Sequence, residues 1–371
     1  MTKSSSDPAA NWWAFPGFKV ETVLCDLDLP ANIAFVPHPG PRPEDPLLYI
    51  NGLYGNVTVL RNDGQTGVYA ASLLNYDPDH KFPGTGESGL TGICVEPRTG
   101  DLFLSMPYFD NDGTVKARVI RTHTADDGLT MESFDTVVQN VPSIKAAHQV
   151  QACSIGFDGK LYVNFGDGMI DPATAQNDSD WRGKILRLEL DGSVPEDNPV
   201  PGSPVYAKGV RNPFGARWRR SDQSLYISDN GPHVDDRVCR VAPGQNLGWP
   251  DDLRDGSIMW WNFCQAPTAL DFNQTGAFSE QFDDELFIAL FGSAYVMGPT
   301  HKGKKIAKMH LSDDGGVKSY DEFVAYTGDG PASCCGLAFG PDGLYFTDLH
   351  GEFADDGKPS RGHVFRIVEL T

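Results

Sequence analysis

Six copies of one short strand pattern constrain the fold of this 371-residue chain more than any other feature. A leucine, an aromatic residue and a further apolar residue recur as LYI (48–50), LFL (102–104), LYV (161–163), LYI (225–227), LFI (286–288) and LYF (344–346). A strand-like run precedes each triplet and another follows it. A period of about 60 residues is too long for a helical-pair or leucine-rich solenoid, and it is typical of a four-stranded propeller blade.

The third repeat shows the unit most clearly. The runs ACSIGF and KLYVNFG are separated by Asp158-Gly159, a strong hairpin signal, and KILRLEL follows after a polar loop. The chain contains 40 glycines and 27 prolines, and no long stretch has the 3.6-residue apolar period of a helix. These features indicate an all-β fold.

The segment FKVETVL (18–24) precedes the first repeat and has no neighbouring strand of its own. We expect it to pair beside HVFRIVEL (363–370), which would close the ring and remove two open sheet edges. The sequence therefore predicts one six-bladed β-propeller over residues 18–371, after an N-terminal tail at 1–17. An insertion is expected at 251–266, between blades four and five. Its Trp260-Trp261 pair would either wall a substrate pocket or pack over a blade face.

Charge and hydropathy narrow the classes of partner and location. The formal net charge of −20 would repel phosphates, so we expect neither nucleic acid nor an anionic membrane as a partner. The apolar runs fall short of the ~20 residues that a membrane-spanning helix needs. The first 15 residues, MTKSSSDPAANWWAF, lack the pattern of a secretory signal, so the expected location is the cytoplasm unless a signal has been removed.

His148 and Asp167 are the best candidates for chemistry. They stand 19 residues apart, at the two open ends of the third-repeat hairpin, so both can project into one loop face. A carboxylate that accepts a hydrogen bond from one imidazole nitrogen fixes the tautomer and raises the basicity of the other. The pair would then act as a general base and its orienting acid. A purely structural pair is the alternative.

The fourth repeat carries further polar candidates at the same face. Arg211 and Asn212 end a strand, where a guanidinium can hold an oxyanion or carboxylate and an amide can fix a carbonyl. The turn at 230–232 would expose backbone carbonyls, and Asp235-Asp236 adds two hard oxygen ligands. Carbonyls with carboxylates are the ligand set of calcium. A hairpin loop with solvated aspartates is the alternative.

An ordered set of motifs makes the chain resemble a known family. These motifs are GESGLTGICVEP, HQVQACSIGFDGKLYVNFGDG, WRGKILRLELDGSVPEDNP, GVRNPFG, SDNGPHVDDRVCRVAPGQNLGWP and ELFIALFGSAYVMGPTHKGKKIAKM. They are similar to those of the soluble quinoprotein sugar dehydrogenases, six-bladed propellers that use pyrroloquinoline quinone (PQQ) and calcium. The similarity runs from about residue 18 to the C-terminus and is strongest to the sorbosone-dehydrogenase-like branch.

The resemblance implies a role for each matching position. His148 would remove the proton of a substrate hydroxyl while hydride passes to the quinone, and Asp167 would orient His148. The remaining implied contacts are Arg211 and Asn212 on the quinone oxygens, Glu87 of GESGL near the cofactor, and the carbonyls of Gly231 and Pro232 on calcium, where the cation polarises the quinone. Members of this family are periplasmic or secreted, so the resemblance implies the same location if a signal has been removed.

The chain departs from the family where cations would hold the quinone carboxylates. The fifth-blade loop reads FGSAYVMGP, with no lysine or arginine. The nearest basic residues are His301, Lys302, Lys304 and Lys305, of which Lys305 is the candidate for cofactor binding. Each charge-assisted bond that a tricarboxylate loses costs roughly 1.5–3 kcal/mol.

The sixth blade departs at Ser333-Cys334-Cys335-Gly336, where the family has an arginine. The adjacent cysteines could form a vicinal disulfide, bind a soft metal near His148 or His350, or remain buried thiols.

Three functions remain open on these grounds. The first is a PQQ- and calcium-dependent dehydrogenase that oxidises a sugar or polyol hydroxyl. The second is a propeller enzyme without PQQ that performs acid–base or metal-assisted chemistry, as a lyase, isomerase or lactonase. The third is a non-catalytic propeller that binds a glycan or a protein.

Overall fold

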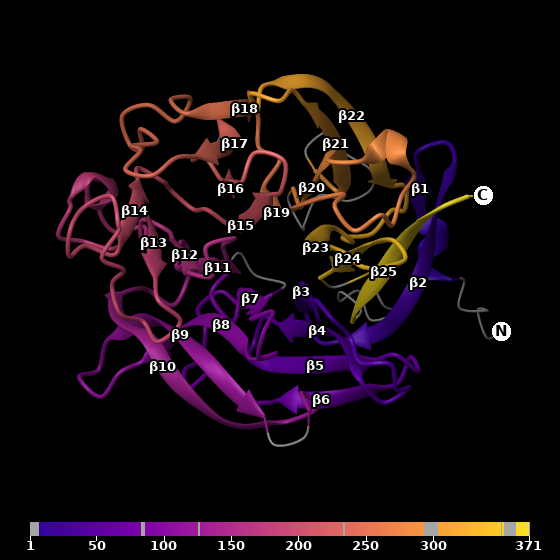
Figure 1. The fold of residues 1–371 in the computed structure, drawn as a ribbon, viewed down its shortest axis with the longest axis horizontal. Coiled ribbons are helices and arrows are strands. Elements are labelled where there is room, and N and C mark those ends of the chain that lie inside the picture. The colour runs from indigo at the N-terminus through magenta and orange to yellow at the C-terminus, as the bar shows by residue number, and fades with distance from the viewer. Residues whose placement is uncertain are drawn as a thin grey trace.

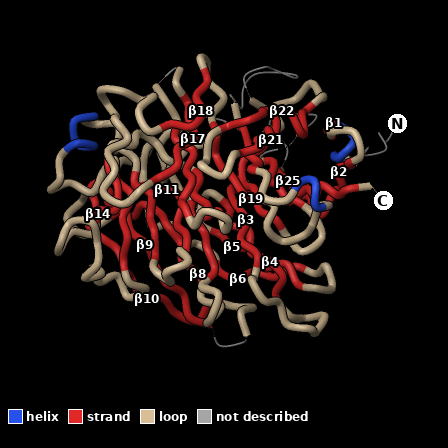
Figure 2. The backbone as a smooth tube through the Cα atoms, turned by 45° about the horizontal axis from the view of Figure 1, so that its top comes forward, coloured by secondary structure: helices blue, strands red, loops and turns tan. Residues whose placement is uncertain are grey.

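The computed structural model describes residues 7–82, 86–124, 127–232, 234–292, 303–349, 351 and 361–370. Six antiparallel sheets surround a central axis as the blades of a propeller, with the chain passing from blade to blade around the ring (Figure 1). This confirms the predicted six-bladed β-propeller. Figure 2 shows that strands form the body of the disc and that the short 3₁₀ helices lie at its edge. Among the described residues, no helix combines the length and the apolar character needed to cross a membrane.

Each blade contains four main strands, which follow one another from the axis to the rim. Blade one holds β3 (Pro30–Phe35), β4 (Pro46–Gly52), β5 (Asn56–Arg61) and β6 (Thr66–Ala70), and blade two holds β7 (Gly92–Val95), β8 (Leu102–Phe109), β9 (Val115–Thr124) and β10 (Met131–Pro142). Blade three holds β11 (Val150–Ile155), β12 (Leu161–Phe165), β13 (Lys184–Leu188) and β14 (Val205–Lys208). Blade four holds β15 (Gly215–Arg219), β16 (Ser224–Asp229), β17 (Asp236–Val241) and β18 (Ser257–Trp261).

The last two blades include strands from the N-terminus. Blade five holds β19 (Pro267–Phe272), β20 (Leu286–Leu290), β21 (Lys305–Leu311) and β22 (Val317–Tyr326), with β1 (Trp12–Ala14) added at its outer edge. Blade six holds β23 (Cys334–Phe339), β24 (Leu344–Asp348), β25 (Gly362–Glu369) and β2 (Phe18–Leu27). The 3₁₀ helices are η1 (Pro8–Asn11), η2 (Pro172–Gln176) and η3 (Glu280–Phe282).

The ring closes between the two ends of the chain, as the sequence predicted. Strand β2 pairs antiparallel with β25, from Phe18 opposite Glu369 to Leu27 opposite Gly362. The outermost strand of blade six is therefore contributed by the N-terminal segment (Figure 1).

Two predicted boundaries need correction. Within the expected tail at 1–17, residues 8–14 form η1 and β1, and β1 pairs with β22 because Trp12 buries its ring in the core between blades five and six. The expected insertion at 251–266 contains β18, which is the outer strand of blade four. Its sequence, SIMWW, lacks the Leu–aromatic signal of the inner strands, so it did not stand out as a strand.

The alternation of the repeated triplet is explained by the interfaces between blades. Leu161 and Val163 pack into the cluster between blades two and three, whereas Tyr162 packs into the cluster between blades three and four. Successive side chains of a strand point to opposite faces. Because both faces of each blade are covered by a neighbour, the inner strands are apolar on both sides.

In blades one, two and three, the residue after the triplet joins the blade to the next one. Asn51 Nδ2 donates to the carbonyl of Leu90 at 2.7 Å, and Asn164 Nδ2 donates to the carbonyl of Gly215 at 3.3 Å. Ser105 Oγ donates to the carbonyl of Gln151 in the same way. These buried bonds link neighbouring innermost regions around the axis.

Candidate active site

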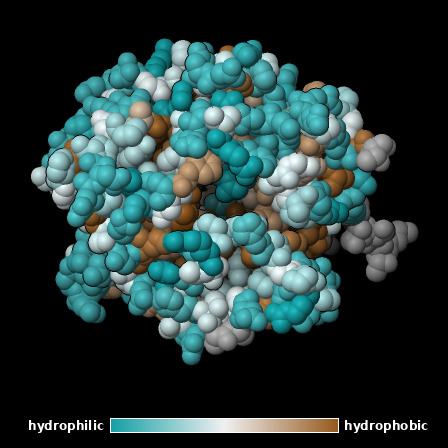
Figure 3. Space-filling model, in the orientation of Figure 1, coloured by the Kyte–Doolittle hydropathy of each residue, from teal (hydrophilic) through white to brown (hydrophobic). Residues whose placement is uncertain are grey.

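A cavity of about 400 Å³ lies where the inner strands of the blades begin. Every blade contributes to its wall near the start of its first strand, through Asn32, Thr91, His148, Asn212, Thr268 and Cys335. The space-filling view shows a hollow at the centre of this face (Figure 3). The cavity is therefore axial, which is where the loops of a propeller gather around a ligand.

His148 and Asp167 form a buried pair at the cavity. The His148 Nδ1 and Asp167 Oδ1 atoms are 2.6 Å apart, and the two residues are 6% and 2% exposed. His148 lines the cavity, whereas Asp167 lies behind it. The geometry is that of an imidazole whose Nδ1 is held by a carboxylate, which leaves Nε2 as the nitrogen that can accept a proton.

The backbone at the open end of the β11–β12 hairpin sets this arrangement. A side chain at Gly166 would meet the carbonyl oxygen of His148 at 2.5 Å, so only glycine permits the close approach of the two strands. The Gly168 N–H donates to that same carbonyl at 3.0 Å. His148 itself has a φ of 51°, a left-handed conformation that is uncommon outside glycine and that occurs at functional sites.

Asp167 is kept ionised by its neighbours. Burial alone would raise its pKa, but the hydrogen bond and charge of His148, the backbone N–H of Met169 and the charge of Arg211 outweigh it and lower the pKa. Its second oxygen, Oδ2, accepts a hydrogen bond from Trp249 Nε1 at 3.0 Å. The carboxylate therefore faces the imidazole on one side and an indole on the other.

Arg211, Asn212 and Glu87 lie on the wall of the same cavity. Asn212 Nδ2 donates to both carboxylate oxygens of Glu87, at 3.1 and 3.2 Å. Burial raises the pKa of Glu87, and the charges of His148 and Arg211 and the Asn212 hydrogen bond reduce this rise without cancelling it. Glu87 is thus placed to hold a proton at a higher pH than a solvated glutamate.

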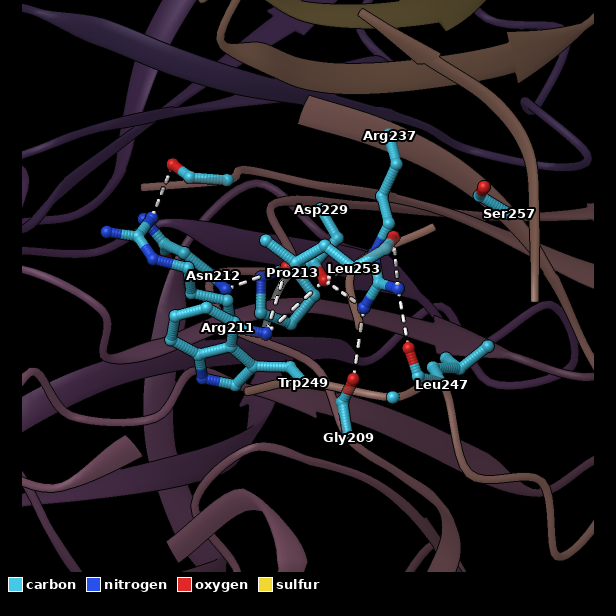
Figure 4. A network of polar contacts seen from close by, with 12 residues as sticks. Gly209, Arg211, Asn212, Pro213, Asp229, Arg237, Leu247, Trp249, Leu253 and Ser257 are labelled. Carbon is cyan, nitrogen blue, oxygen red and sulfur yellow. Dashed lines mark hydrogen bonds and ion pairs between the residues drawn. The ribbon is translucent and has the colours of Figure 1, made fainter. Parts of the chain in front are cut away.

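A buried ion pair between Asp229 and Arg237 fixes the backbone of Arg211 and Asn212 (Figure 4). Asp229, the last residue of β16, accepts the backbone N–H groups of Arg211 at 3.1 Å and of Asn212 at 2.7 Å. Arg237 of β17 donates to Asp229, and its remaining N–H groups reach the carbonyls of Gly209, Leu247, Leu253 and Asp255. The loop that carries the cavity residues is therefore fixed at its backbone.

The predicted calcium ligands do not all meet. Gly231 and Pro232 lie on the cavity wall, but the carbonyl of Gly231 accepts from Arg211 Nη1 at 2.7 Å. Asp235 pairs with Arg254 at 3.0 Å, and both oxygens of Asp236 accept backbone N–H groups. Asp235 precedes β17 with a φ of 64°, and the two carboxylates are engaged by different partners, so this pair does not converge on one ion.

The donor chemistry still fits calcium in part. Among the described residues, no group of three or more histidine, cysteine or acidic side chains is placed to hold a metal ion. A calcium ion on this wall would therefore be held by the carbonyl oxygens of Gly231 and Pro232, a ligand type that calcium accepts. The Gly231 carbonyl would exchange its Arg211 contact for the ion.

The cavity lining fits the ring and carbonyl oxygens of PQQ better than it fits the carboxylates of PQQ. Arg211 and Asn212 offer donors for carbonyl oxygens, and Phe82, Phe214 and Phe291 give apolar walls. Within the described lining, Arg211 is the one lysine or arginine. Three carboxylates would thus meet a single described guanidinium.

The basic candidates of blade five lie elsewhere or outside the described residues. Lys305 pairs with Glu322 and is absent from the cavity wall, so the structure does not bring it to the other predicted cofactor contacts. Lys304 donates to the carbonyl of Gly330 at 2.6 Å inside the blade. His301 and Lys302 are outside the described residues.

The adjacent cysteines are free thiols with different surroundings. Cys334 is buried in the core, whereas Cys335 lines the cavity. Burial, with the charges of Asp348 and Glu87, raises the pKa of Cys335 to about 12, which disfavours the thiolate that a soft metal binds. Of the three alternatives, the structure favours protonated thiols; His350 is outside the described residues.

The tryptophan pair of β18 packs on the blade and is absent from the cavity wall. Trp261 is buried in the cluster between blades four and five, and Trp260 stands under Arg254 at 5.5 Å. The structure therefore supports the second of the two roles expected for this pair.

Trp249 is the site residue that the sequence did not single out. It belongs to the motif NLGWP, yet its indole reaches Asp167, 82 positions earlier in the chain. Its ring also lies 5.6 Å from the guanidinium carbon of Arg211. The one available signal was an aromatic residue between glycine and proline in a loop after a blade strand.

Comparisons with known proteins agree with this architecture. A family model described as Glucose / Sorbosone dehydrogenase matches residues 43–257, more than half of the chain. The chain is 27% identical to aldose sugar dehydrogenase YliI of Escherichia coli (strain K12) over 331 residues, which cover 80% of this chain and 84% of that protein. It is 32% identical to quinoprotein glucose dehydrogenase B of Acinetobacter calcoaceticus over 199 residues, 45% of this chain and 40% of that protein.

Solved structures share the fold over nearly the whole chain. An oxidoreductase described as a glucose dehydrogenase, from Thermus thermophilus, superposes with a TM-score of 0.75 and 25% identity, covering 95% of this chain and 100% of that one. The PQQ-bound aldose sugar dehydrogenase of Streptomyces coelicolor gives a TM-score of 0.70 and 21% identity, covering 96% and 100%.

Proposed function

The chain belongs to the glucose/sorbosone dehydrogenase family and is an oxidoreductase of the sugar dehydrogenase type, and from this premise we propose its reaction. A sugar or polyol hydroxyl is oxidised in the axial cavity, with a PQQ-type quinone as the hydride acceptor and calcium as its partner ion. His148 acts as the general base, and Asp167 orients it.

The observation that carries this proposal is the buried His148–Asp167 pair at the cavity wall. Removing a hydride from a carbon requires that the proton of its hydroxyl leave as well. An imidazole held at Nδ1 can take that proton at Nε2, and Asp167, whose pKa is lowered, stabilises the imidazolium that forms. General base catalysis of this kind contributes about 10²–10⁴-fold to the rate.

The cofactor assignment rests on the donors in the cavity and on the relatives. PQQ, when bound, supplies the two-electron acceptor that the side chains of the protein lack. Arg211 and Asn212 would hold its carbonyl oxygens, Glu87 would stand beside it, and Gly231 and Pro232 would hold calcium. Two relatives carry this cofactor in their names, as a quinoprotein glucose dehydrogenase and as a PQQ-bound aldose sugar dehydrogenase.

A second candidate is acid–base chemistry without a quinone, by a lyase, isomerase or lactonase. One observation favours it, namely that Arg211 is the one lysine or arginine of the described lining, where a tricarboxylate would need several cations. The third reading, a non-catalytic propeller, is disfavoured because the chain belongs to a family of enzymes.

Reconstitution separates the two candidates. The purified chain is titrated with PQQ in the presence and absence of calcium, followed by calorimetry and by reduction of an artificial electron acceptor with a panel of aldoses and polyols. We expect PQQ to bind at micromolar concentrations and His148→Gln to lower kcat by at least about 100-fold.

The matched control is His123→Gln, because His123 also pairs with an aspartate, Asp135 at 2.9 Å, but on the exposed face of blade two. It should leave kcat unchanged. Failure to bind PQQ would overturn the proposed quinone reaction. The second candidate would then be tested by incubating the chain with the same sugars in the absence of an electron acceptor.

A further inference from the structure

Trp249 contacts both Asp167, the partner of His148, and Arg211. Its indole N–H donates to Asp167 Oδ2 at 3.0 Å, and its ring lies 5.6 Å from the guanidinium carbon of Arg211. We infer that Trp249 is a positioning residue that holds the His148–Asp167 pair and Arg211 in one fixed arrangement. The inference rests on the proposed function to the extent that His148 is the base.

The backbone of Trp249 is anchored independently of its indole. Its N–H donates to the carbonyl of Gly209 at 3.1 Å, and its carbonyl accepts from Gln176 Nε2 at 2.5 Å. Gln176 and Asn246 also exchange two amide hydrogen bonds, at 3.0 and 2.8 Å. These bonds join the loop that follows Asp167 to the loop that carries Trp249. A smaller ring at position 249 should therefore occupy the same position as the indole.

The indole binds one oxygen of Asp167, while His148 and the backbone N–H of Met169 bind the other. Oδ1 faces His148 Nδ1 and Oδ2 faces the indole N–H, so the carboxylate cannot rotate without losing one of them. A hydrogen bond to a carboxylate also stabilises its charged form. The charged groups that act on the pair are Arg211 and Arg182 near Asp167 and Glu87 near His148.

These contacts determine the direction in which loss of the indole N–H should move the His148 titration. Without the indole N–H, Asp167 loses a donor, becomes a stronger acceptor and stabilises protonated His148 more. In a variant that lacks the indole N–H, the apparent titration midpoint of His148 should therefore move to higher pH than in the wild type.

Trp249→Phe is the direct test, because it keeps a ring over Arg211 and removes the N–H. The titration of His148 is followed by NMR of its imidazole, identified by its absence in His148→Gln, and the acid limb of the kcat/KM profile is measured in parallel. Both should move to higher pH. The matched control is Trp218→Phe, because Trp218 Nε1 is buried without a hydrogen-bond partner and lies outside the cavity. It should move neither.

A second variant covers the case in which Trp249→Phe does not fold. Gln176→Met removes the anchor of the Trp249 carbonyl and so loosens the loop that carries the indole. The hydrogen bond from the indole to Asp167 is then weakened, and the imidazole titration should move in the same direction by a smaller amount. If the titration is unchanged in every variant that folds, the inference is wrong.

The NMR and activity measurements separate this inference from the proposed function. If His148→Gln keeps full activity while Trp249→Phe shifts the imidazole titration, the assigned base is wrong and the positioning contact stands. If His148→Gln is inactive and Trp249→Phe leaves the titration unchanged, the base stands and the positioning role falls.

Discussion

The guanidinium of Arg237 donates to the carboxylate of Asp229 at 2.7 Å, and neither side chain is exposed to solvent. The pair contacts the backbone of Arg211 and Asn212, because Asp229 accepts hydrogen bonds from both of their N–H groups (Figure 4). A fully buried ion pair of this kind connects the stability of blade four to the shape of the cavity.

Removing Arg237 should therefore be costly. Arg237→Met leaves the Asp229 carboxylate buried without its cation, which typically costs about 3–5 kcal/mol. Urea denaturation measures the loss of unfolding free energy. Arg240→Met is the control, because Arg240 is one-third exposed and should cost less than about 1 kcal/mol. Equal losses in the two variants would contradict the buried-charge argument.

Replacing Trp12 should destabilise the protein far more than replacing the adjacent Trp13. The Trp12 ring lies 5.2 Å from Tyr326 and 5.0 Å from Phe346, so it packs against both blade five and blade six. Trp12→Ala should cost about 3–5 kcal/mol, as expected for a large buried aromatic side chain. Trp13 is 44% exposed, and Trp13→Ala should cost less than about 0.5 kcal/mol. Thermal and urea unfolding of both variants test the contrast, and a mild Trp12→Ala would show that β1 is dispensable.

Glu87 should make stability depend on pH. Burial raises its pKa above the ordinary value of 4.5, so the unfolded chain ionises at a lower pH than the folded protein. The contribution of Glu87 to stability is therefore present below pH 4.5 and is lost as the pH rises through the folded pKa. Glu87→Gln removes this loss while its oxygen still accepts from Asn212. Its melting temperature relative to wild type should rise from acid to neutral pH, and a pH-independent difference would refute the assignment.

Lys184 should control the loop between Asp167 and β13. Its buried ammonium donates to the carbonyls of Thr174, Ala175 and Arg182 at 2.8–3.0 Å. Lys184→Met leaves these carbonyls without that donor, and each unsatisfied group costs about 1–3 kcal/mol. Hydrogen exchange of residues 172–183 should accelerate, and kcat should fall because Asp167 begins this loop. Lys208→Met, which removes only an exposed pair with Asp178, should change neither; unchanged exchange in Lys184→Met would contradict the role.

The propeller could be predicted from the sequence because side chains within one strand alternate between the two blade interfaces. The second strand of each blade presents Leu and a further apolar residue to one interface and an aromatic residue to the other, as Leu225, Tyr226 and Ile227 do. The same logic located His148 and Asp167, since the two open ends of one hairpin must lie close together.

The remaining site could not be predicted because its contacts depend on distant segments or on the face that a side chain occupies. Asp235 and Asp236 are adjacent in sequence, yet one pairs with Arg254 and the other accepts N–H groups from 265 and 266. Lys304 and Lys305 diverge in the same way, toward Gly330 and Glu322. Trp249 reaches Asp167 only after two blades have packed together.

The pairing of β2 with β25 also has a consequence for how the molecule is made. β2 ends at Leu27 and β25 begins at Gly362, so during translation the main strands of the first five blades are made between these two partners. Until β25 follows them, the sheet that will become blade six lacks its rim, and blades one and six cannot seal the disc. The ring can therefore close only after β25 has been synthesised.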